Sequence, residues 1–283
     1  MTDYKLAFLG FGNVGRALAE LLLRKQEELK HDYALTFRVV AIGTGRRGFA
    51  IQPDGFDLPV VMDALARGKT LSEFSAFPVA DAFDLIRNSG AQVLFENTPV
   101  DYATGQPAID HIKLALEHGM HVCTANKGPV VHAWQELKAL ARQKGCQFLH
   151  ESTVMDGAPI FSLFRGALPG ARLQSFKAVL NSTTNLILTR METGESFEEA
   201  VRYAQQIGIA ETDPSGDIDG WDAAIKIAAL ATVLMNQPLK PAEIKRTGIR
   251  AITSEMVTAA KKEGRRYKLV CSAERDGEKI LGK

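Results

Sequence analysis

The sequence contains few cysteines, and their spacing shows no pairing. Its 283 residues include only three, Cys123, Cys146 and Cys271. Their separations match neither a disulfide framework nor a thiolate metal site. We therefore expect a protein of the reducing cytoplasm, with no disulfides and no bound metal.

Long apolar runs and an excess of charge of one sign are also missing. No apolar segment approaches the roughly 18 residues that a membrane-spanning helix needs, and the first residues lack the pattern of a signal peptide. The formal net charge is only +1, which gives no electrostatic reason to expect binding to nucleic acid or to an anionic membrane. With 46% hydrophobic and 24% charged residues, the composition is that of a soluble globular protein. The length allows two domains.

A glycine-rich motif lies between a predicted strand and a predicted amphipathic helix near the N-terminus. Residues 5–9 are apolar, as in a buried parallel strand, and the motif Gly10-Phe-Gly12-Asn13-Val14-Gly15 follows directly. Such glycines often mark only a tight turn. Between a strand and a helix, however, they let backbone amides approach a pyrophosphate at the helix N-terminus. The motif therefore predicts a dinucleotide site formed by Gly10, Gly12, Asn13, Val14 and Gly15.

The end of the second predicted strand, residues 37–42, bears on which dinucleotide binds. An NAD-selective site usually has an acidic residue there, which binds the ribose 2′-hydroxyl. This chain instead continues with Gly-Thr-Gly-Arg46-Arg47, so no carboxylate repels a phosphate and two guanidiniums can pair with one. Unless Arg46 and Arg47 are only solvated loop charges, the sequence favours NADP, with NAD still possible.

Predicted helices and strands alternate up to residue 150, apart from an irregular stretch over residues 48–78. Alternation requires crossover connections and hence a doubly wound parallel sheet of the Rossmann type. Ligands bind beyond the carboxyl ends of such strands, where Thr98 and Lys127 lie. Lys127 could thus reach a cofactor or substrate, although a solvated loop lysine is the simpler alternative. The predicted helices are residues 60–67, 82–88, 107–118 and 133–144, and the further strands are 92–96, 120–123 and 146–149.

Residues 151–283 are predicted to form a second, α+β domain. A helix is expected over residues 160–168, and strands are expected at 175–180 and 268–273, the latter before an Asp276-Gly277 hairpin turn. The polar run at residues 181–185, which includes Thr183, either caps a helix or lines a pocket.

An acidic loop leads into a helix with a single lysine. Five acidic residues lie in the segment from Glu211 to Asp222, and residues 223–235 are almost entirely apolar, with Lys226 their only charged residue. A helix that is apolar on all sides is buried, and Asp222 shares the face of Lys226 one turn earlier. Asp217 or Asp219 is expected to cap this helix.

A lysine kept from water beside carboxylates can donate a proton to a developing alkoxide. The alternative is an ordinary surface salt bridge between Asp222 and Lys226. The apolar flanks and the density of acids favour the first interpretation, and they predict a basic or hydroxylated ligand.

Six motifs in order make the chain resemble homoserine dehydrogenase over nearly its whole length. The last of them is the most specific, whereas the glycine motif alone would not support the resemblance. The motifs are Gly10-x-Gly12-x-x-Gly15, Glu96-x-Thr98-Pro99, Thr124-Ala-Asn-Lys127, Glu151-Ser-Thr-Val154, Leu180-Asn-Ser-Thr-Thr-Asn185 and Glu211…Asp217…Asp222…Lys226.

The resemblance implies NAD(P)-dependent interconversion of L-homoserine and L-aspartate 4-semialdehyde, in the threonine and methionine branch of biosynthesis. It implies that Lys226 and Lys127 transfer the proton or polarise the substrate, with Asp222 as a catalytic partner. It further implies that an amino acid substrate is held by Glu211, Asp217, Asp222 and Thr183, and that two chains form a homodimer through residues 151–283.

The chain also departs from the family pattern. Ser182 replaces a common glycine, and Met155-Asp156 replaces the glycine-rich form of a cation-binding loop, so no ion is predicted. The family normally continues beyond the Asp276-Gly277 hairpin, and we therefore expect a chain truncated at its C-terminus, without a regulatory domain. A non-catalytic NADP-binding protein, or a dehydrogenase for another amino acid aldehyde, is the alternative function.

Overall fold

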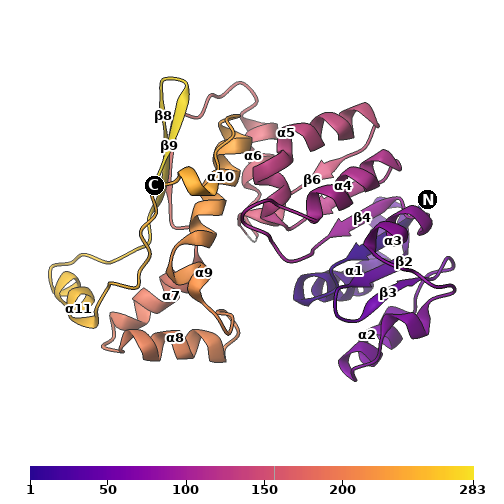
Figure 1. The fold of residues 1–283 in the computed structure, drawn as a ribbon, viewed down its shortest axis with the longest axis horizontal. Coiled ribbons are helices and arrows are strands. Elements are labelled where there is room, and N and C mark those ends of the chain that lie inside the picture. The colour runs from indigo at the N-terminus through magenta and orange to yellow at the C-terminus, as the bar shows by residue number, and fades with distance from the viewer. Residues whose placement is uncertain (156) are drawn as a thin grey trace. The chain divides into compact units, whose positions relative to one another are not determined.

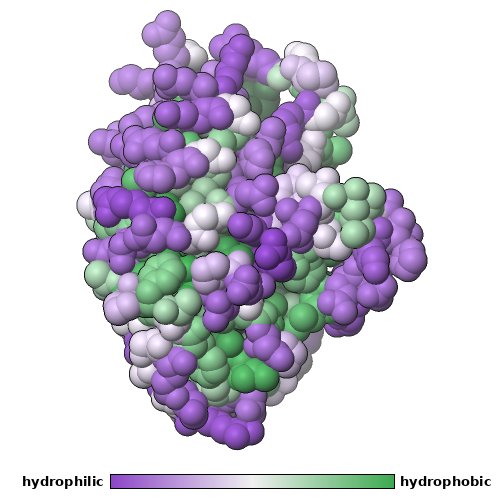
Figure 2. All heavy atoms as spheres, turned by 90° about the vertical axis from the view of Figure 1, so that its right-hand side faces the viewer, coloured by the Kyte–Doolittle hydropathy of each residue, from purple (hydrophilic) through white to green (hydrophobic). Residues whose placement is uncertain are grey.

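The computed structural model describes residues 1–155 and 157–283. They form two compact units, Met1–Thr153 and Val154–Lys283 (Figure 1). No helix in this described part of the chain has both the length and the apolar character needed to cross a membrane. Hydrophobic and hydrophilic residues are interspersed on the face that Figure 2 shows, as is usual for a folded protein.

The first unit contains a six-stranded sheet in the order β3-β2-β1-β4-β5-β6. All neighbouring strands are parallel except β2 and β3, which are antiparallel. The buried residues of β1 and β2 form apolar runs, because helices cover a parallel sheet on both faces. The strands are β1 (Thr2–Leu9), β2 (Leu35–Thr44), β3 (Gly48–Ile51), β4 (Val93–Glu96), β5 (His121–Thr124) and β6 (Phe148–Leu149).

The helices of this unit follow the predicted alternation, and one boundary differs from the prediction by more than two residues. Helix α5 begins at Lys127 and not near residue 133, because the Asn126 side chain caps it by accepting from Gly128 N at 3.0 Å. Pro129 is tolerated because first-turn amides have no partner within the helix. The helices are α1 (Asn13–Tyr33), α2 (Leu58–Ala66), α3 (Ala82–Asn88), α4 (Ala108–Glu117) and α5 (Lys127–Gln143), with short 3₁₀ turns η1 (Leu71–Phe74) and η2 (Glu151–Thr153).

These elements confirm the predicted Rossmann-type fold, with one correction. The stretch that the sequence analysis treated as irregular contains β3, which pairs with β2 through Gly43↔Phe49 and Thr44↔Gly48. This antiparallel edge strand makes the sheet mixed. Its four residues have little periodicity of their own, and their strand conformation depends on pairing with β2.

The second unit has a three-stranded antiparallel sheet in the order β7-β8-β9. Its strands are β7 (Ser175–Ala178), β8 (Cys271–Asp276) and β9 (Lys279–Gly282), and Gly277 (φ +60°) forms the predicted hairpin turn between the last two. Its helices are α6 (Ile160–Ala167), α7 (Ser182–Met191), α8 (Phe197–Gln206), α9 (Ser215–Ile218), α10 (Trp221–Leu234) and α11 (Ser254–Lys262), with the 3₁₀ turn η3 (Pro241–Glu243).

Helix α10 is the buried centre of the second unit and contacts β8 and β9 (Figure 1). Ten of its fourteen residues are buried, which agrees with an apolar pattern on all sides. The helix therefore holds its few polar side chains in fixed positions inside the unit.

Candidate active site

The glycine loop between β1 and α1 combines two closely packed glycines with one that faces open space. Gly10 has φ +91°, and a Cβ there would lie 2.3 Å from the carbonyl carbon of Asn97, at the end of β4. A Cβ on Gly15 would lie 2.6 Å from the Gly10 carbonyl oxygen. At Gly12, by contrast, no described atom lies within 4 Å of the position of a Cβ. The outer two glycines thus allow tight packing, and Gly12 leaves open space before the N-terminus of α1, next to Asn13 and Val14, which are exposed.

The two arginines after β2 differ in their surroundings. Arg46 is exposed, whereas Arg47 is half-buried. The Arg47 Nη1 donates to the Gly68 carbonyl at 2.6 Å, and its backbone nitrogen donates to Thr44 Oγ1 at 2.8 Å. Because a guanidinium has five donor hydrogens, Arg47 can bind a phosphate while it keeps the Gly68 contact.

A buried carboxyl group joins the ends of β4 and β5. Glu96 is 0% exposed and lies opposite Thr124 in the sheet. Its side chain accepts a hydrogen bond from Thr98 N at 3.1 Å and another from the Thr98 hydroxyl, and its Oε2 lies 3.0 Å from Thr124 Oγ1. Burial raises the pKa of the Glu96 carboxyl, and the hydrogen bonds from Thr98 oppose that shift. Glu96 belongs to one of the sequence motifs, but no role was predicted for its side chain.

The same network positions the start of α5. Asn126 is buried, and its Nδ2 donates to the Thr98 carbonyl at 3.1 Å. Lys127 follows as the first residue of the helix and is half-buried. Thr98 and Lys127, both predicted as ligand contacts, therefore lie at the carboxyl ends of adjacent strands.

In the second unit, Lys226 and Asp222 form an ion pair away from solvent. Lys226 Nζ lies 2.9 Å from Asp222 Oδ2, with the two side chains 15% and 13% exposed. Lys226 Nζ also donates to the Leu180 carbonyl at 2.8 Å. This geometry differs from a solvated surface salt bridge, because both side chains are largely withdrawn from solvent and the ammonium has a second hydrogen-bond partner.

Asn181 connects this pair to the acidic loop. Its Nδ2 donates to Asp217 Oδ1 at 2.6 Å and to Asp222 Oδ2 at 3.0 Å. Its Oδ1 accepts from Thr184 N at 2.7 Å and so caps α7. The polar run at residues 181–185 therefore caps a helix, and its Asn181 also joins Asp217, Asp222 and Lys226 in one group of polar side chains, which we call the cluster. Asn181 was not predicted as a site residue, although it begins this polar run.

The other predicted substrate residues lie around the cluster. Thr183 is buried in the first turn of α7, and its hydroxyl donates to the Ile209 carbonyl at 3.4 Å. Glu211 lies in the loop before α9 and is exposed. The structure thus pairs Lys226 with Asp222 directly and links Asp217 to them through Asn181, and it keeps Glu211 at the surface.

The prediction that Asp217 or Asp219 caps α10 was wrong. The N-cap is Gly220, with φ +79°, because the chain must turn sharply between α9 and α10 and glycine adopts that conformation without strain. Asp217 binds Asn181 instead. The carboxylate of Asp219 pairs with the guanidinium of Arg250 through contacts of 2.9 and 3.0 Å.

A segment that we call the strap, residues 246–250, contacts the turn between α9 and α10 through hydrogen bonds. Ile249 N donates to the Ile218 carbonyl at 2.8 Å, and Arg246 Nη1 donates to the Asp219 carbonyl at 2.6 Å. A Cβ on Gly248 would lie only 2.2 Å from the Ile218 carbonyl oxygen. The strap therefore fixes the position of the turn from which α10 begins.

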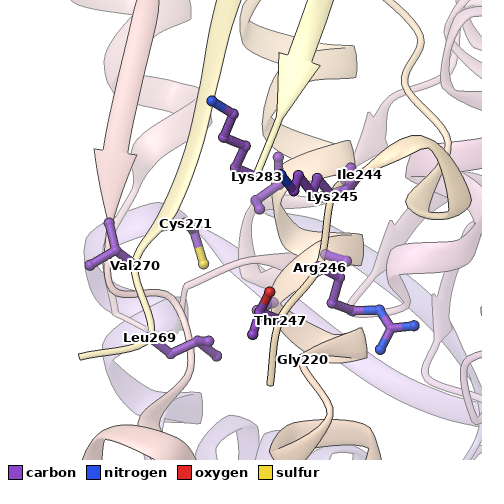
Figure 3. A pocket seen from close by; sticks show the side chains of 12 residues that line it. Gly220, Ile244, Lys245, Arg246, Thr247, Leu269, Val270, Cys271 and Lys283 are labelled. Carbon is purple, nitrogen blue, oxygen red and sulfur yellow. The ribbon is translucent and has the colours of Figure 1, made fainter. Parts of the chain in front are cut away.

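Another face of α10 borders a pocket of about 200 Å³, shown in Figure 3. Ala223 and Ile227 line it from the helix, and its wall includes the N-cap Gly220 and Cys271 of β8. Burial raises the pKa of the Cys271 thiol. Neither Asp222 nor Lys226 lines this pocket, although both lie close enough to Cys271 for their charges to act on its thiol.

The predicted absence of a metal concerns a loop that includes Asp156, which lies outside the described residues. Within the described residues, no group of three or more His, Cys, Asp or Glu side chains is arranged to hold a metal ion.

Comparisons with known proteins agree in both units. The family model described as "Homoserine dehydrogenase, NAD binding domain" matches residues 10–151, and the one described as "Homoserine dehydrogenase" matches residues 159–281. The NAD(+)-dependent homoserine dehydrogenase of Pseudomonas canavaninivorans is 35% identical over 280 residues, which cover 98% of this chain and 79% of that protein. The homoserine dehydrogenase of Methanocaldococcus jannaschii is 39% identical over 267 residues, which cover 94% and 79%.

A solved structure is similar over the whole chain. A hyperthermophilic archaeal homoserine dehydrogenase mutant in complex with NADPH has a TM-score of 0.80 and 31% identity, and the match covers 100% of this chain and 81% of that one. These matches confirm the resemblance that the sequence motifs indicated, including a nicotinamide dinucleotide as cofactor. The chain belongs to the homoserine dehydrogenase family, the NAD(P)-dependent oxidoreductases of amino-acid biosynthesis that interconvert L-homoserine and L-aspartate 4-semialdehyde.

Proposed function

We propose that Lys226 supplies the proton in this hydride transfer. As hydride reaches the aldehyde carbon of L-aspartate 4-semialdehyde, negative charge develops on the oxygen, and an ammonium can neutralise it. Within the described residues, Asp222 Oδ2 and the Leu180 carbonyl hold two of the Lys226 hydrogens. An ammonium has three donor hydrogens, so one can point at the substrate. The proposal rests on these two contacts, which hold the Lys226 ammonium in place.

The substrate's ammonium group is proposed to bind the carboxylates. Asp217 and Asp222 lie on either side of the Asn181 amide, and together with Lys226 they leave one negative charge in the cluster. Glu211, which is exposed, adds a carboxylate that can approach the substrate from the loop, and Thr183 contributes from α7. An amino acid substrate fits this pattern because it brings a positive charge.

The cofactor is proposed to bind along the carboxyl edge of the first unit's sheet. The open space at Gly12 and the first-turn amides of α1 suit the pyrophosphate. Arg46 and Arg47 are the candidates for a 2′-phosphate, which would favour NADP over NAD. Thr98 and Lys127 would lie near the reacting nicotinamide, and Lys127 would help to polarise the substrate. When bound, the cofactor supplies the hydride.

We further infer a homodimer of a cytoplasmic enzyme, with no role in binding nucleic acid. β7 and β9 are the outer strands of the small sheet, and outer strands offer unpaired backbone groups to another chain. Val179, Val270 and Leu281 expose apolar side chains in this unit. The three free cysteines are typical of a reducing compartment.

The test of the lysine assignment is steady-state oxidation of NADPH with L-aspartate 4-semialdehyde. Lys226→Ala should lower kcat by about 10²–10⁴-fold, the usual contribution of general acid catalysis, while NADPH binds as before. Lys226→Arg should not restore turnover, because a guanidinium differs in shape and does not release its proton.

Lys113→Ala is a matched control, because Lys113 pairs with Glu136 at 2.7 Å in the first unit and should keep normal turnover when replaced. If Lys226→Ala also turned over normally, the proton donor would have to be sought elsewhere, beginning with Lys127.

A further inference from the structure

Residues 180 and 181 contact every charged member of the cluster in the second unit. The Leu180 carbonyl accepts from Lys226 Nζ, and the Asn181 amide donates to Asp217 and Asp222. Asn181 is 3% exposed. Its two carboxylate partners lie 36 and 41 residues away in the sequence, so it joins segments that no local structure would bring together.

The orientation of the Asn181 amide follows from its hydrogen bonds. A backbone N–H can only donate, so the atom 2.7 Å from Thr184 N must be the oxygen Oδ1. The NH₂ group then faces the acidic residues, where its two hydrogens match two acceptors, at 2.6 Å on Asp217 and 3.0 Å on Asp222. All donors and acceptors of this buried side chain are therefore used in one arrangement.

A neutral donor between two carboxylates has a specific electrostatic effect. Two like charges at close range repel each other, and hydrogen bonds to the charged form offset that repulsion. An amide supplies such bonds without adding a positive charge of its own, as a lysine or arginine would. The two carboxylates, Asp217 and Asp222, therefore keep their negative charge and can still bind a cation.

We propose that Asn181 is a positioning residue that holds Asp217 and Asp222 as a paired receptor for the ammonium group of the amino acid substrate. The inference rests on the proposed function, in which these carboxylates bind that group. It assigns to Asn181 a contribution to substrate affinity, separate from the proton transfer by Lys226.

Helix capping alone does not account for this residue. Capping of α7 uses only Oδ1, and Asp, Ser or Thr would serve that purpose as well as Asn. The NH₂ group contributes nothing to the cap, and its hydrogen bonds to described residues go to the two carboxylates. The two tasks can therefore be separated by substitution.

The experiment compares three variants by steady-state kinetics with aspartate semialdehyde and NADPH. Asn181→Asp keeps a capping oxygen and loses both donor hydrogens. Asn181→Ala loses the cap and the donors. Thr253→Ala removes the cap of α11, where Thr253 Oγ1 accepts from Met256 N, and so reports the effect of cap loss away from the cluster.

We expect Asn181→Asp and Asn181→Ala to raise KM for aspartate semialdehyde by about 10- to 100-fold, the range for lost hydrogen bonds to charged groups. The Kd for NADPH should be unchanged in both, and Thr253→Ala should alter neither constant. Titration calorimetry with L-homoserine should show the same loss of affinity as KM. The proposal is overturned if Asn181→Asp keeps the KM and the homoserine affinity of the unmodified protein.

A second readout distinguishes a donor from a purely structural group. A carboxyl at position 181 that takes up a proton regains one donor hydrogen. Burial beside the carboxylates of Asp217 and Asp222 should raise the pKa of such a carboxyl well above its ordinary value. The activity of Asn181→Asp relative to the unmodified protein should therefore rise as the pH is lowered from about 8 to about 6. The other ionisable groups that face this position are Asp217 from α9, Asp222 and Lys226 from α10, and Cys271 from β8. A ratio that does not change with pH would contradict the donor role.

Lys226→Ala, measured in parallel, separates this inference from the proposed function. If it abolishes turnover while Asn181→Asp behaves normally, only the role of Asn181 is lost. If both variants turn over normally, the cluster is not the active site and both proposals fall.

Discussion

Lys226 and Asp222 lie one helical turn apart on α10, and their charged groups are 2.9 Å from each other in the buried centre of the second unit. The pair is oriented from a second side, because Asp222 accepts from Asn181 and Lys226 donates to the Leu180 carbonyl. A flexible surface pair would lack this restraint. The lysine is therefore held in one direction before any substrate arrives, which lowers the cost of aligning it during the reaction.

Replacing Asp222 should impair turnover by misorienting Lys226. For Asp222→Asn, we expect a loss of kcat of about 10- to 100-fold, as for the loss of a charge-assisted hydrogen bond. Asp63→Asn is the matched control, because Asp63 of α2 forms an exposed i,i+4 pair with Arg67, the C-cap of that helix. The measurement is steady-state kinetics on both variants. An equal kcat for Asp222→Asn and Asp63→Asn would mean that the buried pair contributes no more to turnover than the exposed one.

Glu211 should affect substrate binding more than chemistry. It is exposed in the loop before α9, away from the hydrogen bonds that fix Lys226. Glu211→Ala should therefore raise KM for the amino acid substrate and leave kcat within about threefold, as expected when ground-state and transition-state binding weaken together. A fall in kcat with unchanged KM would assign Glu211 to the chemical step instead.

The two arginines after β2 should determine the choice of cofactor. We expect NADPH to bind more tightly than NADH, and the double variant Arg46→Ala/Arg47→Ala to lose most of that difference. Contacts between arginine and phosphate would account for about 1.5–3 kcal/mol. Fluorescence titration with both cofactors is the measurement, and equal affinities in the unmodified protein would contradict the prediction.

Two glycines of the same loop should respond differently to substitution. Gly12→Ala should fold normally, because a Cβ there meets no described atom within 4 Å, yet it should weaken dinucleotide binding by occupying the phosphate space. Gly10→Ala should instead lower Tm, because its φ is +91° and its Cβ would approach Asn97 to 2.3 Å. Thermal unfolding and NADPH titration of both variants separate the effects. A Gly12→Ala protein with full NADPH affinity would show that the phosphate binds elsewhere.

The second unit should associate through its small sheet. Sedimentation at micromolar concentration should show a species of twice the chain mass. Leu281→Lys, on the outer strand β9 where Leu281 is 49% exposed, should shift that species toward the monomer. A monomer in the unmodified protein would reject the dimer.

The sequence predicted those elements whose conformation depends on neighbouring residues, and it missed those that depend on contacts with distant segments. The α3 helix was predicted with its observed bounds, Ala82–Asn88, and the burial of α10 followed from an apolar run of more than three turns. β3 was missed because its strand conformation depends on its pairing with β2. The cap of α10 was misassigned because Asp217 and Asp219 bind Asn181 and Arg250, which lie far away in the sequence.

The residues of the candidate site also fall into those that local spacing predicts and those that depend on long-range contacts. The i,i+4 spacing placed Asp222 beside Lys226, and strand ends located Thr98 and Lys127. The buried contacts of Glu96 and Asn181 could not be read from spacing. Each joins segments at least 28 residues apart through hydrogen bonds that only the folded chain creates.

The strap across the turn before α10 has a consequence for local stability. Residues 246–250 and residues 218–219 share a backbone hydrogen bond, two arginine contacts and a close backbone approach at Gly248. The turn therefore cannot fray alone, because its opening also breaks the contacts of the strap. The two segments form one cooperative unit of local unfolding, so their amide hydrogens should exchange with solvent at similar rates although they are far apart in the sequence.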